Sequence, residues 1–179
     1  MFKTREIVER TSKTYSLYFE NQRGYAHFTL VPDLGIVHAQ TDWGDYCHRW
    51  GNIGEETLEE FLSDIDSYYI GIKFCGKPSE LDEKATLKDI KKDILKERRK
   101  GYLSARMARK NYDDCSEINF DSNTAFYLTF PNRIITEIYD SDPSSVPLRM
   151  TYTGWQTVFI NEIFPAFQEY LKNRILVNE

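Results

Sequence analysis

The chain has 179 residues, of which 41% are hydrophobic and 15% aromatic, and this composition is unlike that of disordered proteins. Its length suffices for one compact domain with a substantial core. No apolar run approaches the roughly 18 residues that a transmembrane helix needs, and Met1 is not followed by the apolar stretch of a secretory signal. We therefore expect a cytoplasmic protein without a membrane partner.

The formal net charge of −5 conceals a strong asymmetry along the chain. The segment from Lys84 to Lys110 contains eleven Lys and Arg residues against three acidic residues, a local balance of +8, which leaves −13 for the rest. Opposite charges gathered on one small protein steer its association with charged partners. The three cysteines are an odd number without a C-x-x-C pair, so we expect reduced thiols rather than disulfides or a cysteine zinc site.

Residues 12–40 are predicted to form a three-stranded antiparallel meander. Strand-rich segments at 15–19, 25–31 and 36–40 are separated by the turn sequences Asn21-Gln-Arg-Gly24 and Pro32-Asp-Leu-Gly35. Residues 41–56 then combine two tryptophans, a tyrosine and several glycines, without helical or strand periodicity. We interpret them as a specified aromatic and glycine-rich loop, since large rings anchor a loop and glycines permit unusual backbone conformations.

Residues 57–179 are predicted to be mainly helical, with about four helices. A capping box at Thr57 opens a helix over 58–75 that ends before Gly76. A second capping sequence at Thr86 opens the basic segment, which Gly101 kinks or breaks. Apolar periodicity predicts further helices over 123–139 and 155–171, interrupted or bent by Pro131 and Pro165. The predicted fold is a single α+β domain spanning residues 1–179.

Two groups of residues are candidate contacts for a partner. Clustered cations bind phosphate backbones or acidic surfaces, and exposed aromatic rings form binding hot spots or stack on bases. The alternative for the cations is a solvated helix surface, and for the aromatic rings it is a buried anchor, which we favour for at least one tryptophan. The candidates are Lys91, Lys92, Lys96, Arg98, Arg99, Lys100, Arg106, Arg109 and Lys110, together with Trp43, Tyr46 and Trp50.

Evidence for catalysis or for a cofactor is weak. If Pro32 and Asp33 centre the turn, His27 and His38 face each other across the ladder, but a zinc site needs more ligands than two. Asp42 and Asp45, with Asp64 or Asp66, offer carboxylates for Mg²⁺, although short acidic residues more often cap turns and helices. The common nucleophile and phosphate-binding motifs are absent. We predict no metal, no cofactor and no catalytic residues, and a chain more suited to binding than to catalysis.

Several motifs resemble a family of accessory proteins encoded by phages and prophages, a family without an assigned activity. They are Trp43-Gly-Asp-Tyr46, Trp50-Gly-Asn-Ile-Gly54, Leu58-Glu-Glu-Phe-Leu62, Asp66-Ser-Tyr-Tyr69, and the segment from Phe159 to Leu171 around Phe164-Pro165. Phe164 stands where we expect a tryptophan before this proline. The resemblance implies a small protein made during infection, and some phage proteins of this size inhibit CRISPR effectors or other host defences.

The leading functional hypothesis is a non-enzymatic protein that uses the basic helix and the aromatic loop to bind and block a host nucleoprotein machine such as a CRISPR effector. The first alternative is direct binding of DNA or RNA. The second is a metal-dependent, nuclease-like enzyme built on His27, His38 or the acidic loop. The sequence leaves open the identity of the target, the oligomeric state, and whether the acidic remainder imitates nucleic acid.

Overall fold

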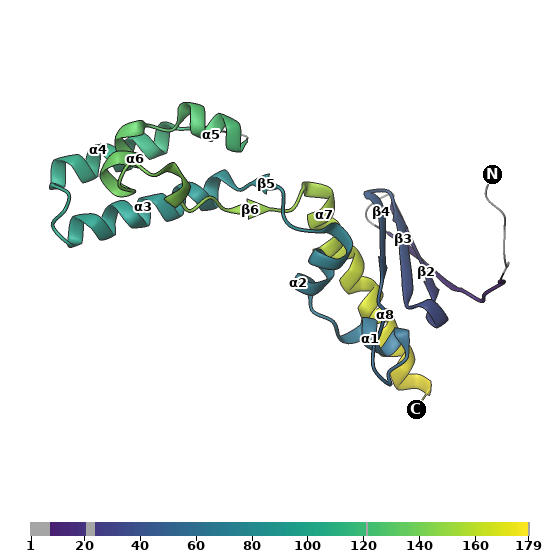
Figure 1. The fold of residues 1–179 in the computed structure, drawn as a ribbon. Helices are drawn as coiled ribbons and strands as arrows, with labels where there is room; N and C mark the ends of the chain where they lie inside the picture. The colour runs from purple at the N-terminus through teal and green to yellow at the C-terminus, as the bar shows by residue number, and fades with distance from the viewer. Residues whose placement is uncertain (1–7, 21–23, 121, 179) are drawn as a thin grey trace, which may run out of the picture. The chain divides into compact units, whose positions relative to one another are not determined.

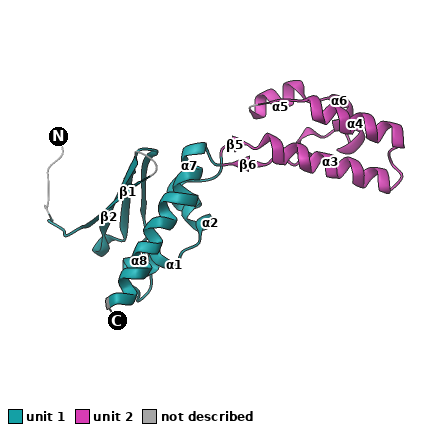
Figure 2. Ribbon diagram, turned by 180° about the vertical axis from the view of Figure 1, so that it is seen from behind, with its two compact units in different colours: residues 1–78, 152–179 teal, residues 79–151 magenta. Residues whose placement is uncertain are grey.

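The computed structural model describes residues 8–20, 24–120 and 122–178. The chain divides into two compact units (Figure 2). Unit 1 comprises residues 1–78 and 152–179, and unit 2 comprises residues 79–151. Unit 2 is therefore an insertion within the sequence of unit 1.

Unit 1 contains a four-stranded antiparallel sheet whose strands follow one another in chain order (Figure 1). The strands are β1 (Lys13–Phe19), β2 (Gly24–Val31), β3 (Ile36–Thr41) and β4 (Gly44–Arg49). The predicted three-stranded meander is confirmed. The turn predicted at residues 21–23 lies outside the described residues.

The prediction of a loop over residues 41–56 is wrong for its central part, which forms β4. Side chains alternate along this strand, with Tyr46 and then Trp50 buried while Asp45 and Cys47 are exposed. Cross-strand pairing with β3, such as that of Tyr46 with Ala39, compensates for the low strand propensity of Gly44 and Asp45. Tertiary pairing thus overrides local propensity here.

The turn between β2 and β3 fixes a register that differs from the prediction. Residues Pro32–Leu34 form a 3₁₀ turn (η1), and Gly35 follows with φ +61°, so the ladder closes at Val31 opposite Ile36. His27 therefore pairs with Gln40 rather than with His38. The predicted facing pair of histidines is wrong, because the turn holds two more residues than a two-residue hairpin.

The predicted helix over 58–75 is interrupted. The capping box is confirmed, since the Glu60 amide donates to the Thr57 hydroxyl at 3.2 Å and the Thr57 amide donates to the Glu60 carboxylate at 2.7 Å. Helix α1 (Leu58–Asp64) ends at Ile65, and Asp66 caps α2 (Ser67–Ile70), which continues as the π-helical turn η2 (Gly71–Cys75). The apolar period runs through the break, so the sequence does not reveal it.

The carboxy-terminal helix is longer than predicted. It starts with α7 (Gly154–Val158), widens into the π-helical turn η4 (Phe159–Ile163), and continues as α8 (Phe164–Asn178). Pro165 lacks an amide hydrogen, and the wider turn directly before it accommodates the lost hydrogen bond. The predicted bend thus takes the form of a π turn.

The helices of unit 1 pack on one face of the sheet through stacked aromatic rings. Phe28 of β2 stacks on Phe167 of α8 with ring centroids 4.1 Å apart and planes at 8°. Tyr46 of β4 stacks on Phe159 at 3.9 Å. Burying each phenylalanine contributes roughly 2–3 kcal/mol, so these pairs are a major attachment between sheet and helix.

Unit 2 has a core of its own, formed mainly by four helices. They are α3 (Glu83–Arg99), α4 (Ala105–Glu117), α5 (Asn123–Thr129) and α6 (Asn132–Ile138), followed by the 3₁₀ turn η3 (Pro143–Ser145). Gly101, with φ +84°, lies in the break between α3 and α4, and Pro131 separates α5 from α6 within the helix predicted over 123–139. Buried Ile90, Ile94, Phe126 and Ile134 belong to this core.

The two ends of unit 2 are hydrogen-bonded to each other. Short strands β5 (Glu80–Leu81) and β6 (Met150–Thr151) form an antiparallel pair. The Asp82 amide also donates to the Arg149 carbonyl at 2.8 Å.

The sheet and helices together confirm the predicted α+β class, while the extent of one domain over residues 1–179 stays a prediction. Among the described residues, no helix combines the length and apolarity needed to cross a membrane.

We predict that Gly35→Ala destabilises the protein by roughly 2 kcal/mol or more. A Cβ at this position meets the Trp50 carbonyl oxygen at 2.3 Å, and the positive φ adds backbone strain. Gly51→Ala is the matched control, because a Cβ there has no neighbour within 4 Å; we expect a change within about 0.5 kcal/mol. Urea unfolding measures both, and equal midpoints for the two variants contradict the prediction.

We predict that one thiol of the folded protein reacts rapidly with a disulfide reagent at pH 8. Cys47 is exposed on the sheet, whereas burial raises the pKa of Cys75 and of Cys115 to about 11. Such a pKa leaves roughly one thiol in a thousand as the reactive thiolate at pH 8. Cys47→Ser should remove the fast phase, and two or more rapidly reacting equivalents in the unchanged protein contradict this expectation.

Candidate binding surface on the α3–α4 hairpin

The basic residues of the sequence lie on an antiparallel pair of helices, α3 and α4. Capping side chains fix where each helix begins: Asp82 accepts from the Ala85 amide at 2.8 Å, and Ser104 accepts from the Met107 amide at 3.2 Å. Ile90 and Ile94 of α3 are buried in the core of unit 2, together with Ala108 and Cys115 of α4. Helical periodicity therefore directs the long cationic side chains outward.

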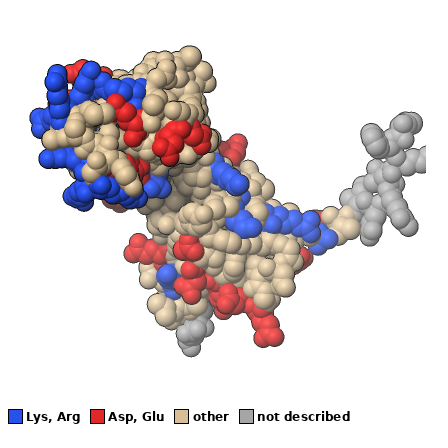
Figure 3. All heavy atoms as spheres, turned by 60° about the vertical axis from the view of Figure 1, so that its left-hand side comes forward, with Lys and Arg blue, Asp and Glu red and all other residues tan. Residues whose placement is uncertain are grey.

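The charge asymmetry is internal to unit 2. Residues 79–151 contain thirteen Lys and Arg and thirteen Asp and Glu, so this unit has a formal net charge of zero, and the net −5 belongs to unit 1. Within unit 2, eleven of the thirteen cations but only three of the thirteen acids fall between Lys84 and Lys110, the segment that joins most of α3 to the start of α4. The space-filling view shows this concentration of Lys and Arg on one part of the molecule (Figure 3).

Some of the nine predicted cations have acidic partners within their own helix. Lys92 pairs with Asp89 at 2.7 Å, Lys100 pairs with Glu97 at 2.7 Å, and Arg109 pairs with Asp113 at 3.0 Å. These cations are substantially exposed, and such pairs contribute little to stability. Hydrogen bonds from Lys92 and Arg149 lower the pKa of Asp89, so this carboxylate stays ionised at neutral pH.

The other exposed cations of the set have no acidic partner within residues 8–20, 24–120 and 122–178. Among the described residues, no ion pair or side-chain hydrogen bond engages these five: Lys96, Arg98, Arg99, Arg106 and Lys110. They lie on the last turn of α3 and the first turns of α4, around the connection between the two helices. Their charges are thus available to an external partner.

A hydrophobic groove accompanies these cations. Two adjoining hollows of about 490 and 340 Å³ share Leu95 and Tyr112, which are both more than a third exposed. Leu87 and Ile118 extend the apolar floor, and basic side chains at its edge include Lys88 and Arg98. The sequence reveals the cations, but not this groove, because its floor forms only when α3 and α4 pair.

Lys91 differs from the other predicted cations because it is partly buried. Its ammonium group donates to the Ser116 hydroxyl at 2.8 Å and lies 4.9 Å from the centre of the Tyr112 ring. Contact with an aromatic face stabilises a cation electrostatically. Lys91 therefore helps to hold α4 against α3, in addition to contributing charge.

The aromatic candidates are in unit 1, and two of them are core residues. Tyr46 is 7% exposed and Trp50 is 6% exposed. The Trp50 indole donates to the Tyr69 hydroxyl at 3.2 Å, and the Tyr46 hydroxyl donates to the Trp43 carbonyl at 3.0 Å. Their prediction as partner contacts is corrected, since burial leaves them little surface. Trp43 is only partly buried and retains exposed surface.

The acidic and histidine candidates for a metal site do not form one cluster in the described part of the chain, and two of them bind backbone amides instead. Asp42 accepts from the Tyr25 amide at 3.0 Å, and Asp66 accepts from the Tyr69 amide at 2.9 Å. Within residues 8–20, 24–120 and 122–178, no group of three His, Cys, Asp or Glu side chains lies close enough to hold a metal ion.

Comparison with known proteins assigns the chain to a family. A protein family described as a phage family matches residues 7–173, which is almost the whole sequence. The chain belongs to this phage family. A search of curated proteins found no match, and a search of solved structures also found none. Membership in the family confirms the resemblance to phage proteins and by itself assigns no activity.

Proposed function

We propose that this phage protein acts by binding, and that it inhibits a host nucleoprotein machine of the CRISPR-effector type through the α3–α4 hairpin. The observation that carries the proposal is the group of five cations around the α3–α4 connection that have no acidic partner in the described part of the chain, beside an exposed apolar groove. Membership in a phage family supports a role during infection. No catalytic motif accompanies the surface in the sequence.

Charge and apolar surface together favour a protein partner with an acidic, amphipathic surface. Cations at a rim steer the encounter and select the partner, whereas buried apolar contacts provide most of the affinity. An amphipathic helix places its apolar face into a groove of this kind. A duplex backbone offers phosphates to the cations but has no apolar group for Leu95.

We expect the triple variant R98Q/R99Q/R106Q to weaken capture of the partner at least about tenfold, since each lost charge contact costs on the order of 0.5–1 kcal/mol. The matched control is R49Q/K77Q/K172Q, which removes the same charge from exposed positions of unit 1. The experiment is a pull-down from infected or transformed cells, followed by titration of the purified partner and an assay of host defence.

The outcomes of this experiment separate a specific surface from a general charge effect. The proposal expects the control variant to bind as the unchanged protein does, and both variants to keep the unchanged unfolding temperature, because all six side chains are exposed. Equal weakening by both triple variants overturns the hairpin assignment. Absence of any stable complex, with host defence unaffected, overturns the inhibitor function itself.

Direct binding of DNA or RNA is the second candidate, favoured by the same unpaired cations. Because binding to phosphates releases counterions, the logarithm of the binding constant falls linearly with the logarithm of the salt concentration. The slope is about −0.9 for each phosphate neutralised on duplex DNA. Gel shifts with bare nucleic acid across a salt series test it. Binding with a steep salt slope, reduced in R98Q/R99Q/R106Q, favours this candidate over the protein partner.

A further inference from the structure

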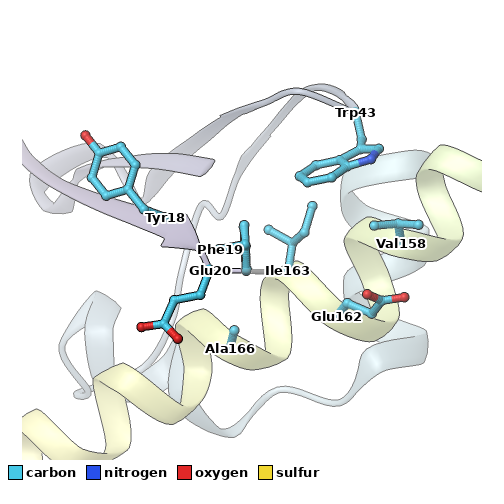
Figure 4. Close-up of a pocket in the computed structure, with 8 residues that line it drawn as sticks. All are labelled: Tyr18, Phe19, Glu20, Trp43, Val158, Glu162, Ile163 and Ala166. Atoms are coloured by element: carbon cyan, nitrogen blue, oxygen red, sulfur yellow. The ribbon is translucent and has the colours of Figure 1, made fainter. Parts of the chain in front are cut away.

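Unit 1 has a concave site of its own, in addition to the groove on the α3–α4 hairpin of unit 2. A hollow of about 450 Å³ lies between the end of β1, the β3–β4 turn and the carboxy-terminal helix (Figure 4). Phe19, Trp43 and Val158 provide part of its apolar lining, and Glu20 and Glu162 are also in the lining. The site therefore combines aromatic and aliphatic surface with two carboxylates.

The indole of Trp43 is held in a defined position although it remains partly exposed. The Trp43 amide donates to the Thr41 hydroxyl at 3.0 Å, and its carbonyl accepts from the Tyr46 hydroxyl at 3.0 Å. The ring meets Phe19 edge-on at 6.1 Å and lies directly over Gly24, where a Cβ would come within 2.4 Å of it. A rigid, partly exposed tryptophan loses little conformational entropy when a ligand covers it.

The two carboxylates of the site have no bonded partner in the part of the chain that the structure describes. Glu20 and Glu162 are exposed, and no hydrogen bond or ion pair engages either side chain among the described residues. Glu162 lies one helical turn from Val158 and one from Ala166, so these three residues share the face that lines the hollow. Figure 4 shows the two carboxylates on opposite sides of the hollow, with that of Glu20 turned away from Trp43, so their negative charge borders the hollow from two sides.

We propose that this hollow in unit 1 binds an arginine side chain presented by a partner protein. A guanidinium group stacks on the face of an aromatic ring and donates paired hydrogen bonds to a carboxylate. Trp43 supplies the ring, and the exposed side chain of Glu20 or of Glu162 turns toward it to supply the acceptor. Phe19 and Val158 contact the aliphatic stem of the arginine. The net charge of −5 on unit 1 attracts such a basic partner. The inference is independent of the function proposed for the hairpin.

The test uses the full chain and a peptide pair that differs only in charge. Acetyl-Gly-Arg-Gly-amide and the same peptide with citrulline, which is neutral and nearly isosteric with arginine, are titrated into labelled protein and followed by NMR. The expected result is a shift of the Trp43 indole resonance, assigned with Trp43→Phe, by the arginine peptide only. Glu20→Gln and Glu162→Gln should each weaken that binding roughly fivefold.

A third charge variant controls for the overall negative charge of unit 1. Glu169→Gln removes an exposed carboxylate of α8 that does not line the hollow, so it should leave arginine binding unchanged. Equal binding of the arginine and citrulline peptides overturns the proposal, as does equal weakening by all three variants. A lysine peptide that binds as well as the arginine peptide overturns the choice of guanidinium, and no resonance shift at millimolar peptide overturns the site.

Discussion

The stacking of Phe28 on Phe167 is the contact on which the architecture depends. It joins a strand near the start of the chain to a helix near its end, and the fully buried Phe159 and Phe164 extend the same aromatic layer. Closing so long a stretch of chain costs entropy, which the burial of several large rings offsets. Once sheet and final helix are joined, everything between Pro78 and Tyr152 forms a separate unit whose ends return to one place.

This arrangement assigns different charge to the two units. Unit 1 carries the net −5 and unit 2 is neutral overall, yet unit 2 contains the densest group of cations because ten of its thirteen acids lie outside residues 84–110. The net charge of the chain therefore says little about what either unit attracts. Local fields around α3 and α4, and around the hollow near Trp43, decide which charged groups approach.

The sequence predicts the features that depend on local chemistry. Turn residues and alternation locate three strands of the meander, the Thr57 capping box locates the start of α1, and the cations fall on helices as expected. It does not reveal features that depend on pairing between distant segments. The sequence left Tyr46 and Trp50 as candidates for either a partner surface or a buried anchor, and only the pairing of β4 with β3 shows that they point into the core.

The same limit applies to the candidate sites. The groove on the α3–α4 hairpin cannot be inferred from periodicity, because Leu95 and Tyr112 become neighbours only when α3 packs on α4. The hollow near Trp43 likewise requires β1, the β3–β4 turn and the carboxy-terminal helix together. Since β5 and β6 hold the ends of unit 2 side by side, recombination between Leu81 and Met150 can exchange this module for another without disturbing the aromatic layer. Exchange of the insertion therefore leaves the attachment of sheet to helix intact, since the stacked rings of Phe28, Phe167, Tyr46 and Phe159 all belong to unit 1.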